Sequence, residues 1–257
     1  MKNSKMPVLF IGHGSPINAI EDNEFNQSWR KIARNIPKPK AILSISAHWE
    51  TRGTSLTGAQ KPPTIHDFVG FPPKLFQVKY PASGSPWLVD KMTRLLDQVT
   101  ITIDLNWGFD HGTWSVLSAM FPMADVPVVQ MSLNRSRDVD YHYMLGEKLG
   151  VLRQEGVLIL GSGNLVHNLP EAVFKDVAFD WAVQFDANTR DWILQRNHHS
   201  LIYYEKLNGA ASLAINTAEH YLPFLYVLGA SSAADDIQFY CEKVTLGSVS
   251  MRCVRFG

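Results

Sequence analysis

The chain is poor in cysteine, with only Cys241 and Cys253 among its 257 residues, both near the C-terminus. So few thiols argue against a disulfide framework and against a thiolate-rich zinc site. The sequence also lacks any apolar run of about 18 or more residues, so we expect no membrane span. The opening MKNSKM is polar and leads straight into an apolar run, which does not fit a signal peptide. Together these features predict a cytoplasmic protein.

An excess of either charge is also missing, since 24 basic residues balance 24 acidic ones. Proteins that bind nucleic acid or an anionic membrane normally carry a basic face, so we expect neither partner. What the chain does have is hydrophobic residues, at 46%, and a length sufficient for a sizeable core. No repeat, low-complexity tract or linker divides it, so we expect a single domain over residues 1–257.

Apolar runs rich in β-branched residues alternate with segments of helical spacing, which predicts alternating strands and helices. The first five runs lack polar alternation, the pattern of strands buried on both faces. The expected fold is therefore α/β, with a central, largely parallel or mixed sheet flanked by helices on both faces. The expected strands cover residues 8–12, 41–46, 100–103, 126–132, 157–162 and 246–254. The expected helices cover residues 23–36, 85–99, 139–156, 181–197 and 220–230.

The stretch from Thr51 to Pro86 departs from this alternation. It is rich in proline, glycine and aromatic residues and contains PPTIHDFVGFPP at residues 62–73. A loop of this length within a compact domain is more often functional than merely connecting. We therefore expect part of this segment to serve a functional site.

Three histidines follow predicted strands closely: His13, His48 and His167. The first lies between two glycines in GHGSP, and flanking glycines allow a sharp turn beside a ligand. In open α/β sheets, ligands bind at the carboxyl ends of the strands, so we expect these side chains near one another. His111 and His220 lie at loop-to-helix junctions that could reach the same edge. Neutral imidazole suits zinc, iron, copper and nickel, so the pattern predicts a metal site.

Any one of these histidines alone is better explained as a hydrogen-bonded core or loop residue. The set also lacks the fixed short spacing of HExxH, so the metal prediction depends on the number and position of the histidines. Among the remaining histidines, His66 could either reach the site or simply hydrogen-bond Asp67. We expect the other three, His142, His198 and His199, to face solvent.

Seven segments taken together resemble the class III extradiol ring-cleavage dioxygenases, and most closely the branch called DOPA 4,5-dioxygenase. The resemblance extends in order over nearly the whole chain, and the set is highly specific. It implies one LigB-like catalytic domain with an α/β fold and a mononuclear metal site. It also implies O₂-dependent opening of a catechol ring beside its two hydroxyls. The segments are GHGSP (12–16), SAHWE (46–50), PPTIHDFVGFP (62–72), YPASGSP (80–86), WGFDHGTW (107–114), GSGNLVHNL (161–169) and EHYLPFLYVLGA (219–230).

Carried over by motif, the resemblance implies that His13, His48 and His220 bind the metal. His167 would be either a fourth ligand or the acid/base group beside the metal, and His111 a second acid/base or oxygen-site group. A neighbouring imidazole could accept a proton from the catechol, because histidine titrates near neutral pH. His167 is the first choice for this role and His111 the second. The cofactor would be one divalent metal ion, zinc or Fe(II).

This ligand set departs from the two-His-one-carboxylate arrangement that related class III enzymes resemble. His220 stands at the third-ligand position here, with Glu219 beside it. Three imidazoles are a more zinc-like set. O₂ chemistry, however, needs a redox-capable ion, and zinc has no accessible second oxidation state. The sequence therefore leaves zinc and Fe(II) open.

The partners implied by the resemblance are a small catechol and O₂, and nothing in the sequence indicates the oligomeric state. The polar groups of a DOPA-like substrate would need partners, for which Arg52, Asp67 and Tyr221 are available. A planar ring could lie against nearby aromatic side chains, although for two of them, both tryptophans, core packing is the better explanation. The candidate wall residues are Phe68, Phe71 and Trp107, together with the two candidates for core packing, Trp49 and Trp114.

Other functions fit part of the pattern. A zinc-dependent hydrolase could use the same histidines to lower the pKa of a bound water to about 7. A simple metal- or ligand-binding module is less well supported, because His111 and His167 are surplus to a closed site. The glycines of GHGSP and GSGN match neither GxGxxG nor GxxxxGKS/T, which argues against phosphate binding.

Overall fold

The fold is described here from a computed structural model that covers residues 5–207 and 209–257. Its strands are β1 (Val8–Gly12), β2 (Ala41–Thr51), β3 (Thr54–Thr57), β4 (Ile101–Asp104), β5 (Val128–Asn134), β6 (Val157–Gly163), β7 (Ile237–Tyr240), β8 (Val244–Thr245), β9 (Val249–Ser250) and β10 (Cys253–Phe256). Within the described residues, the central sheet has eight strands in the order β4-β3-β5-β2-β6-β1-β10-β7. Strands β5, β2, β6 and β1 pair in parallel, whereas β10 and β7 pair antiparallel at one edge.

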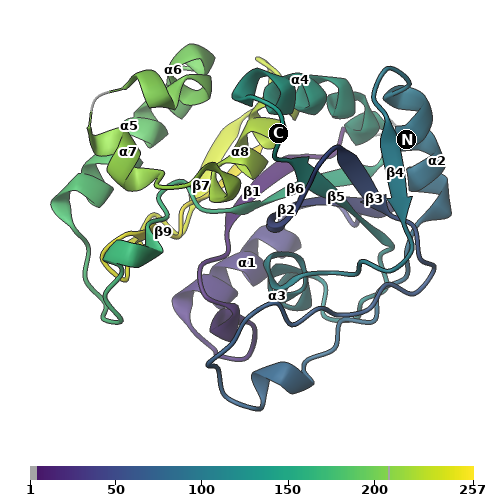
Figure 1. Ribbon diagram of the computed structural model, residues 1–257, viewed down its shortest axis with the longest axis horizontal. Coiled ribbons are helices and arrows are strands. Elements are labelled where there is room, and N and C mark those ends of the chain that lie inside the picture. Colours follow the sequence, from purple (N-terminus) through teal and green to yellow (C-terminus); the bar gives the residue numbers. More distant parts are fainter. Residues whose placement is uncertain (1–4, 208) are drawn as a thin grey trace.

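Helices cover both faces of this sheet (Figure 1). They are α1 (Glu24–Arg34), α2 (Pro86–Leu95), α3 (His111–Met120), α4 (Val139–Leu149), α5 (Asp180–Leu194), α6 (His198–Ile202), α7 (Ala210–Ala214) and α8 (Leu222–Ala230). Among the described residues, no helix combines the length and the apolar character that crossing a membrane would require.

The two faces of the sheet bury separate hydrophobic clusters. On one face, Val8 and Leu43 pack with residues of α2, α4, α5 and α8. On the other face, Leu9 and Ile42 pack with residues of α1 and α3. Because successive side chains of a strand point to opposite faces, a continuous apolar run such as VLFI contributes to both clusters. The expected α/β fold, with a mixed sheet covered on both faces, is confirmed.

Two of the expected strands differ from the structure in burial or continuity. The run 100–103 forms β4, but β4 lies at the sheet edge and its side chains are half-exposed or exposed rather than buried. The run 246–254 is not one strand. Leu246 and Gly247, with positive φ angles of 52° and 76°, lie in the turn between β8 and β9, and β10 begins only at Cys253. The chain therefore turns before β9 and pairs again in β10. The sequence also does not predict β3 or β7.

His142 is buried, so the expectation that it faces solvent is wrong. It lies on α4, which packs so closely against α8 that a Cβ at Gly146 would lie 2.4 Å from the carbonyl oxygen of Tyr226. The Nδ1 of His142 lies 3.0 Å from the hydroxyl of Tyr226. Burial lowers the pKa of His142 to about 4. This imidazole is a neutral part of the helix interface.

His198 and His199 begin the helix α6 instead of lying in a turn. His199 is exposed, as expected. His198 is half-buried, and its Nδ1 lies 2.8 Å from the hydroxyl of Tyr143 on α4. For His198 the expected exposure is therefore only partial.

Candidate metal centre and active site

His13 lies directly after β1, at the carboxyl edge of the parallel strands. Its backbone N–H donates to the carbonyl of Gly163 at 3.1 Å and so continues the pairing of β1 with β6. Gly12 has no room for a side chain, since a Cβ there would lie 2.6 Å from the carbonyl carbon of Met251. Gly14 has a φ of +57°, which glycine adopts without strain. The flanking glycines thus let the chain turn tightly and leave the imidazole at the sheet edge.

His48 lies within β2, which is longer than the predicted strand 41–46 and continues to Thr51. The pairing of β2 with β5 shifts register between Ile45 and Glu50, on either side of His48. Irregularities of this kind redirect side chains and are frequent beside active sites. The register shift interrupts the regular pairing around His48, near the carboxyl end of β2.

His220 ends the short 3-10 helix η6 (Ala218–His220), immediately before α8. Its carbonyl oxygen accepts the N–H of Asn164 at 2.9 Å. A Cβ at Gly163 would lie 2.0 Å from the same oxygen, so only glycine admits this turn against the end of β6. The approach of η6 to β6 brings His220 to the edge that already carries His13.

These three histidines converge although they come from distant parts of the sequence. The donor nitrogens of His13, His48 and His220 all lie within 4.8 Å of one another. The ring centroids are 5.0 Å apart for His13 and His48, 5.3 Å for His13 and His220, and 5.0 Å for His48 and His220. Three imidazoles at these distances can share one metal ion and leave further coordination positions open.

Hydrogen bonds determine which nitrogen of His13 carries the proton. The hydroxyl of Ser162 donates to the carbonyl of Gly112 at 2.6 Å and lies 3.0 Å from Nδ1 of His13. Because a hydroxyl has one proton, Ser162 must accept from Nδ1–H, which leaves a lone pair on Nε2 of His13. The same holds for His220, whose Nδ1 lies 3.1 Å from a carboxylate oxygen of Glu219, which can only accept.

The Nε2 atoms of His13 and His48 face each other at 3.0 Å. Two nitrogen lone pairs at this distance require a proton or a cation between them. Metal–imidazole bonds of about 2.0–2.1 Å place neighbouring ligand nitrogens roughly 3.0–3.4 Å apart, in agreement with this distance. Histidines that bind metals usually donate their other N–H to a carboxylate or another acceptor, as His13 and His220 do. The donor set therefore fits a metal ion.

Burial keeps these imidazoles neutral near pH 7. It is the largest cause of the lowered pKa of His13 and of His220, and neighbouring histidines lower both further. Burial also lowers the pKa of His48 to about 3, with His111 adding to the shift. Since metals bind imidazole in its neutral form, the cluster is ready to bind a cation without first losing protons.

His111 is the first residue of α3 and lies beside His48, with ring centroids 3.8 Å apart. Asp67, from the long loop, accepts the backbone N–H of His111 at 3.0 Å and its Nδ1–H at 2.9 Å. Burial opposes the ionisation of Asp67, but the hydrogen bonds from His111 outweigh it and lower the pKa of Asp67. Asp67 thus binds His111 instead of being available to a substrate.

His167 stacks on His220, with ring centroids 3.4 Å apart and planes at 11°. Its donor nitrogen lies within 4.8 Å of ligand atoms of Glu219 and His220, a second group that shares His220 with the first. Burial lowers the pKa of His167 to about 4, although Glu219 acts in the opposite direction. His167 is therefore a neutral imidazole next to the cluster, able to accept a proton.

Aromatic side chains surround the histidines. Trp49 and Trp107 stack with ring centroids 5.4 Å apart and planes at 7°. Phe68 meets the ring of His111 edge-on, at 5.6 Å and 85°, and Phe71 packs against Phe68 at 5.2 Å. Phe68 is therefore in contact with a histidine beside the three converging ones.

Of three other candidates, two are buried with their polar groups already hydrogen-bonded, and one is exposed. Trp114 belongs to the core, since it is fully buried and its Nε1 donates to the carbonyl of Ile65 at 2.8 Å. Tyr221 is buried, and its hydroxyl donates to the carbonyl of Leu201 at 2.8 Å, so this group is already used. Arg52 is exposed in the turn between β2 and β3.

His66 stabilises the long loop. Its Nε2 lies 3.1 Å from the carbonyl oxygen of Val78, and its ring packs 5.9 Å from that of Phe68. The hydrogen bond to Asp67 that the sequence suggested does not form, because both oxygens of that carboxylate bind His111.

Several supporting residues were not predicted from the sequence. Asp110 caps α3 by accepting the N–H of Thr113 at 3.1 Å, and it also binds the hydroxyl of Ser46 and the amide of Gln130. Burial raises the pKa of this carboxyl to about 6. An Asp directly before a helix is a recognisable capping signal. Ser162 has no such signal, since its contact with the cluster depends on how β1 and β6 pair.

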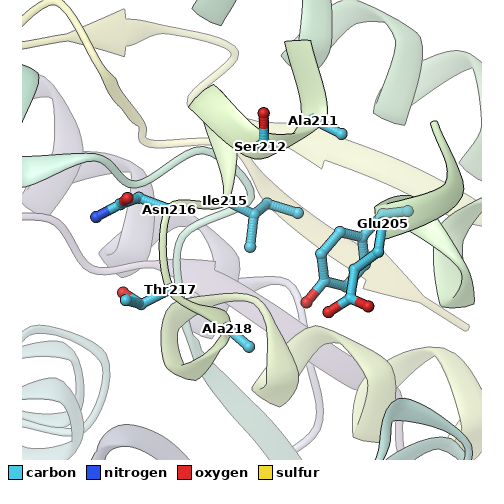
Figure 2. A pocket seen from close by; sticks show the side chains of 8 residues that line it. Glu205, Ala211, Ser212, Ile215, Asn216, Thr217 and Ala218 are labelled. Atoms are coloured by element: carbon cyan, nitrogen blue, oxygen red, sulfur yellow. The ribbon is translucent and has the colours of Figure 1, made fainter. Parts of the chain in front are cut away.

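A separate cavity of about 190 Å³ lies beside the turn that leads to His220 (Figure 2). Figure 2 shows Glu205, Ile215 and Thr217 among its lining side chains. Within the described part of the chain, none of the clustered histidines lines this cavity. The candidate active site is therefore the histidine cluster and not this cavity.

Nearly the whole chain matches one protein family. Residues 7–252 match the family described as the catalytic LigB subunit of aromatic ring-opening dioxygenase. The chain belongs to this family. It is 43% identical to 4,5-DOPA dioxygenase extradiol of Escherichia coli, over 100% of this chain and 97% of that protein. It is 39% identical to 4,5-DOPA dioxygenase extradiol of Beta vulgaris, over 87% of this chain and 86% of that protein.

The fold agrees with a solved structure of similar sequence. An uncharacterized protein from Escherichia coli K12 superposes with a TM-score of 0.84 at 37% identity, over 98% of this chain and 100% of that one. The protein is thus a metal-dependent extradiol dioxygenase that opens an aromatic ring with O₂. The family and enzyme class inferred from the sequence are confirmed, and the zinc-hydrolase alternative is not favoured.

Proposed function

We propose that this dioxygenase opens the ring of a DOPA-like catechol beside its two hydroxyls, at one divalent ion held by His13, His48 and His220. The observation that carries this assignment is the convergence of their donor nitrogens to within 4.8 Å. The names of the relatives, 4,5-DOPA dioxygenase extradiol, support the substrate class. A single sheet that includes strands from Val8 to Phe256 supports one catalytic domain over the chain.

The active ion in this proposal is Fe(II). When bound, the ion supplies Lewis acidity toward the catechol oxygens and the redox chemistry that a reaction with O₂ requires. Three neutral imidazoles also suit zinc, but zinc has no accessible second oxidation state. The zinc form is therefore expected to fold and to turn over no catechol.

His167 and His111 are the proton-transfer groups of the proposal. Burial lowers the pKa of His167 to about 4, which keeps its ring neutral and leaves a nitrogen lone pair for a hydroxyl proton of a bound catechol, although the same shift weakens the ring as a base. We assign it an acid/base role and not a fourth ligand position because its ring stacks face to face on that of His220. His111 donates Nδ1–H to Asp67, which leaves Nε2 free to exchange a proton.

Phe68 is the aromatic wall residue that the contacts support best. Its ring lies 5.6 Å from that of His111 in an edge-on arrangement. An aromatic side chain in this position can pack against a planar substrate ring and exclude water from the proton-transfer groups.

Metal reconstitution under anaerobic conditions tests the proposed function. Metal-free protein is loaded with Fe(II) or with Zn(II), then mixed with DOPA or simpler catechols and O₂. We expect O₂ uptake and a yellow ring-opened product with Fe(II) alone. Absence of turnover in the fully loaded Fe(II) protein would contradict the proposal, as would ester or amide hydrolysis by the zinc form without O₂.

A further inference from the structure

The long loop between β3 and α2 is firmly attached next to α3. The N–H of Ile65 donates to the carbonyl of Phe109, and the N–H of Phe109 donates to the carbonyl of Pro63, each at 2.8 Å. The indole Nε1 of Trp114 also donates to the carbonyl of Ile65, at 2.8 Å. These bonds fix the backbone at Ile65, two residues before Asp67, and so restrict the position of the Asp67 carboxylate.

Both oxygens of Asp67 form hydrogen bonds with His111, and Oδ2 also lies 3.7 Å from Nδ1 of His48. Oδ1 accepts the backbone N–H of His111 at 3.0 Å, and Oδ2 lies 2.9 Å from its Nδ1. The side chain of Asp67 is 18% exposed and that of His111 is 8% exposed, so water competes little for the hydrogen bond between them. Because a carboxylate only accepts, Nδ1 of His111 carries the proton and its Nε2 carries a lone pair.

The ring of His111 is also held on its other sides. The ring of His48 lies 3.8 Å from it, and those of Phe68 and His13 lie 5.6 Å away, both edge-on. A flip of the imidazole by 180° would place a carbon opposite Asp67 and lose the hydrogen bond. Packing and the carboxylate therefore favour the same orientation.

We propose that Asp67 is a positioning residue for His111. By accepting a hydrogen bond from Nδ1–H, it fixes the tautomer in which Nε2 of His111 is unprotonated and can exchange a proton with the substrate. The tautomer follows from the contacts of this chain, whereas its consequence for turnover rests on the proposed function. Replacement of such an Asp by Asn can cost up to about 10⁴-fold in kcat, because it selects the wrong tautomer.

Asp67→Asn separates the shape of the side chain from its acceptor character. The amide oxygen can still accept the backbone N–H of His111, while the amide NH₂ donates to Nδ1 and moves the ring proton to Nε2. The ¹⁵N NMR spectrum of histidine-labelled, zinc-loaded protein reports the tautomer without any turnover. The His111 signals are assigned by their loss in His111→Gln.

We expect Nδ1-protonated His111 in the parent protein and Nε2-protonated His111 in Asp67→Asn. The matched control is Asp125→Asn, which removes a remote carboxylate paired with Lys38 and should leave these signals unchanged. An unchanged His111 tautomer in Asp67→Asn would overturn the proposal. If that variant folds poorly, Asp67→Ala, which removes both acceptors, should give a mixture of tautomers in place of one.

Kinetics of the Fe(II) enzyme give the second test. We expect Asp67→Asn to lower kcat by about 10²-fold or more, with metal content and the KM for catechol nearly unchanged. In a His111→Ala background the same substitution should have little further effect, because Asp67 acts through His111. If Asp67→Asn lowers kcat by the same factor in the His111→Ala background as in the parent enzyme, Asp67 does not act through His111 and the positioning role is overturned. If the tautomer changes as expected but no form turns over catechol, the proposed function fails and the role of Asp67 in setting the tautomer stands.

Discussion

The histidines of the site are held in place in two different ways, by the sheet side (His13, His48 and His220) and by the loop side (His111 and Asp67). His13 and His48 are anchored to strands of the sheet, and His220 to a turn packed on a strand end. His111 is instead held by the carboxylate of Asp67, which comes from a loop. A strand position is fixed by a ladder of backbone bonds, whereas a loop carboxylate acts through two side-chain bonds. We therefore expect changes on the sheet side to alter metal binding, and changes on the loop side to alter turnover.

The largest effect is expected on the sheet side. His13→Ala or His48→Ala removes one of three donors, so bound metal should fall from about one ion per chain to near zero, and turnover with it. Elemental analysis of protein reconstituted with Fe(II) measures the change. A normal metal content in either variant would contradict the ligand assignment and remove the contrast between the two sides.

The loop side should behave differently. His111→Ala is expected to keep its metal and to lose about 10²–10⁴-fold in turnover, because an acid/base group is missing. Metal content and O₂ uptake measured on the same sample distinguish the two effects. Loss of the metal would show that His111 belongs with the ligands.

A smaller effect is expected for the support of His13. Ser162→Ala removes the acceptor for Nδ1–H of His13, and loss of such a partner typically costs about 10–100-fold in metal affinity. Competition with a chelator measures this affinity. Ser44→Ala is the matched control, since this buried serine lies on β2 and binds Thr113 instead of a histidine. Equal losses in both variants would show that the cause is general loosening of the sheet.

The smallest effect on the site is expected from the distant ion pair of Arg153 and Asp235. Burial opposes the ionisation of Asp235, but hydrogen bonds from Arg153 and from the N–H of Ser232 outweigh it and lower the pKa of Asp235 to about 2. A pKa below the ordinary 3.8 means that the ionised form stabilises the fold above about pH 4, and that this stability is lost as the pH falls toward 2.

Asp235→Asn should lower the free energy of unfolding by about 1–3 kcal/mol at pH 7, and the difference from the parent protein should shrink below about pH 4. Urea unfolding followed over this pH range measures it. Metal content and kcat should stay unchanged. A parallel loss of metal would show that the cluster depends on overall stability and not on its local supports.

Much of the fold could be predicted because the relevant patterns are local. Apolar runs without polar alternation predicted the inner strands β1, β2, β5 and β6, and helical spacing predicted α1, α2, α4, α5 and α8. The positions of His13 and His48 could be predicted from the order of strand and histidine, because parallel strands end at one edge. The position of His220 at a loop-to-helix junction made it a candidate for the same edge, and the family resemblance added its role as a ligand.

Other features depended on contacts between distant segments. His142 has the polar character of an exposed helix residue, yet α8 covers it because glycines allow the two helices to approach closely. The sequence left Asp67 available either to a substrate or to His66, yet His111 binds both of its oxygens. The run 246–254 has the composition of one strand, but its first two residues form a turn with positive φ angles and the rest is divided between β9 and β10.

The sequence by itself determined the order and type of the main elements, and it placed His13 after one buried strand and His48 near the carboxyl end of another. It could do so because periodicity and turn-forming residues act over a few neighbouring positions. Only the tertiary structure decided which acceptor each imidazole meets, such as Ser162 for His13 and Asp67 for His111. Those pairs join residues 149 and 44 positions apart, and strand pairing and loop packing, which no short segment encodes, bring them together.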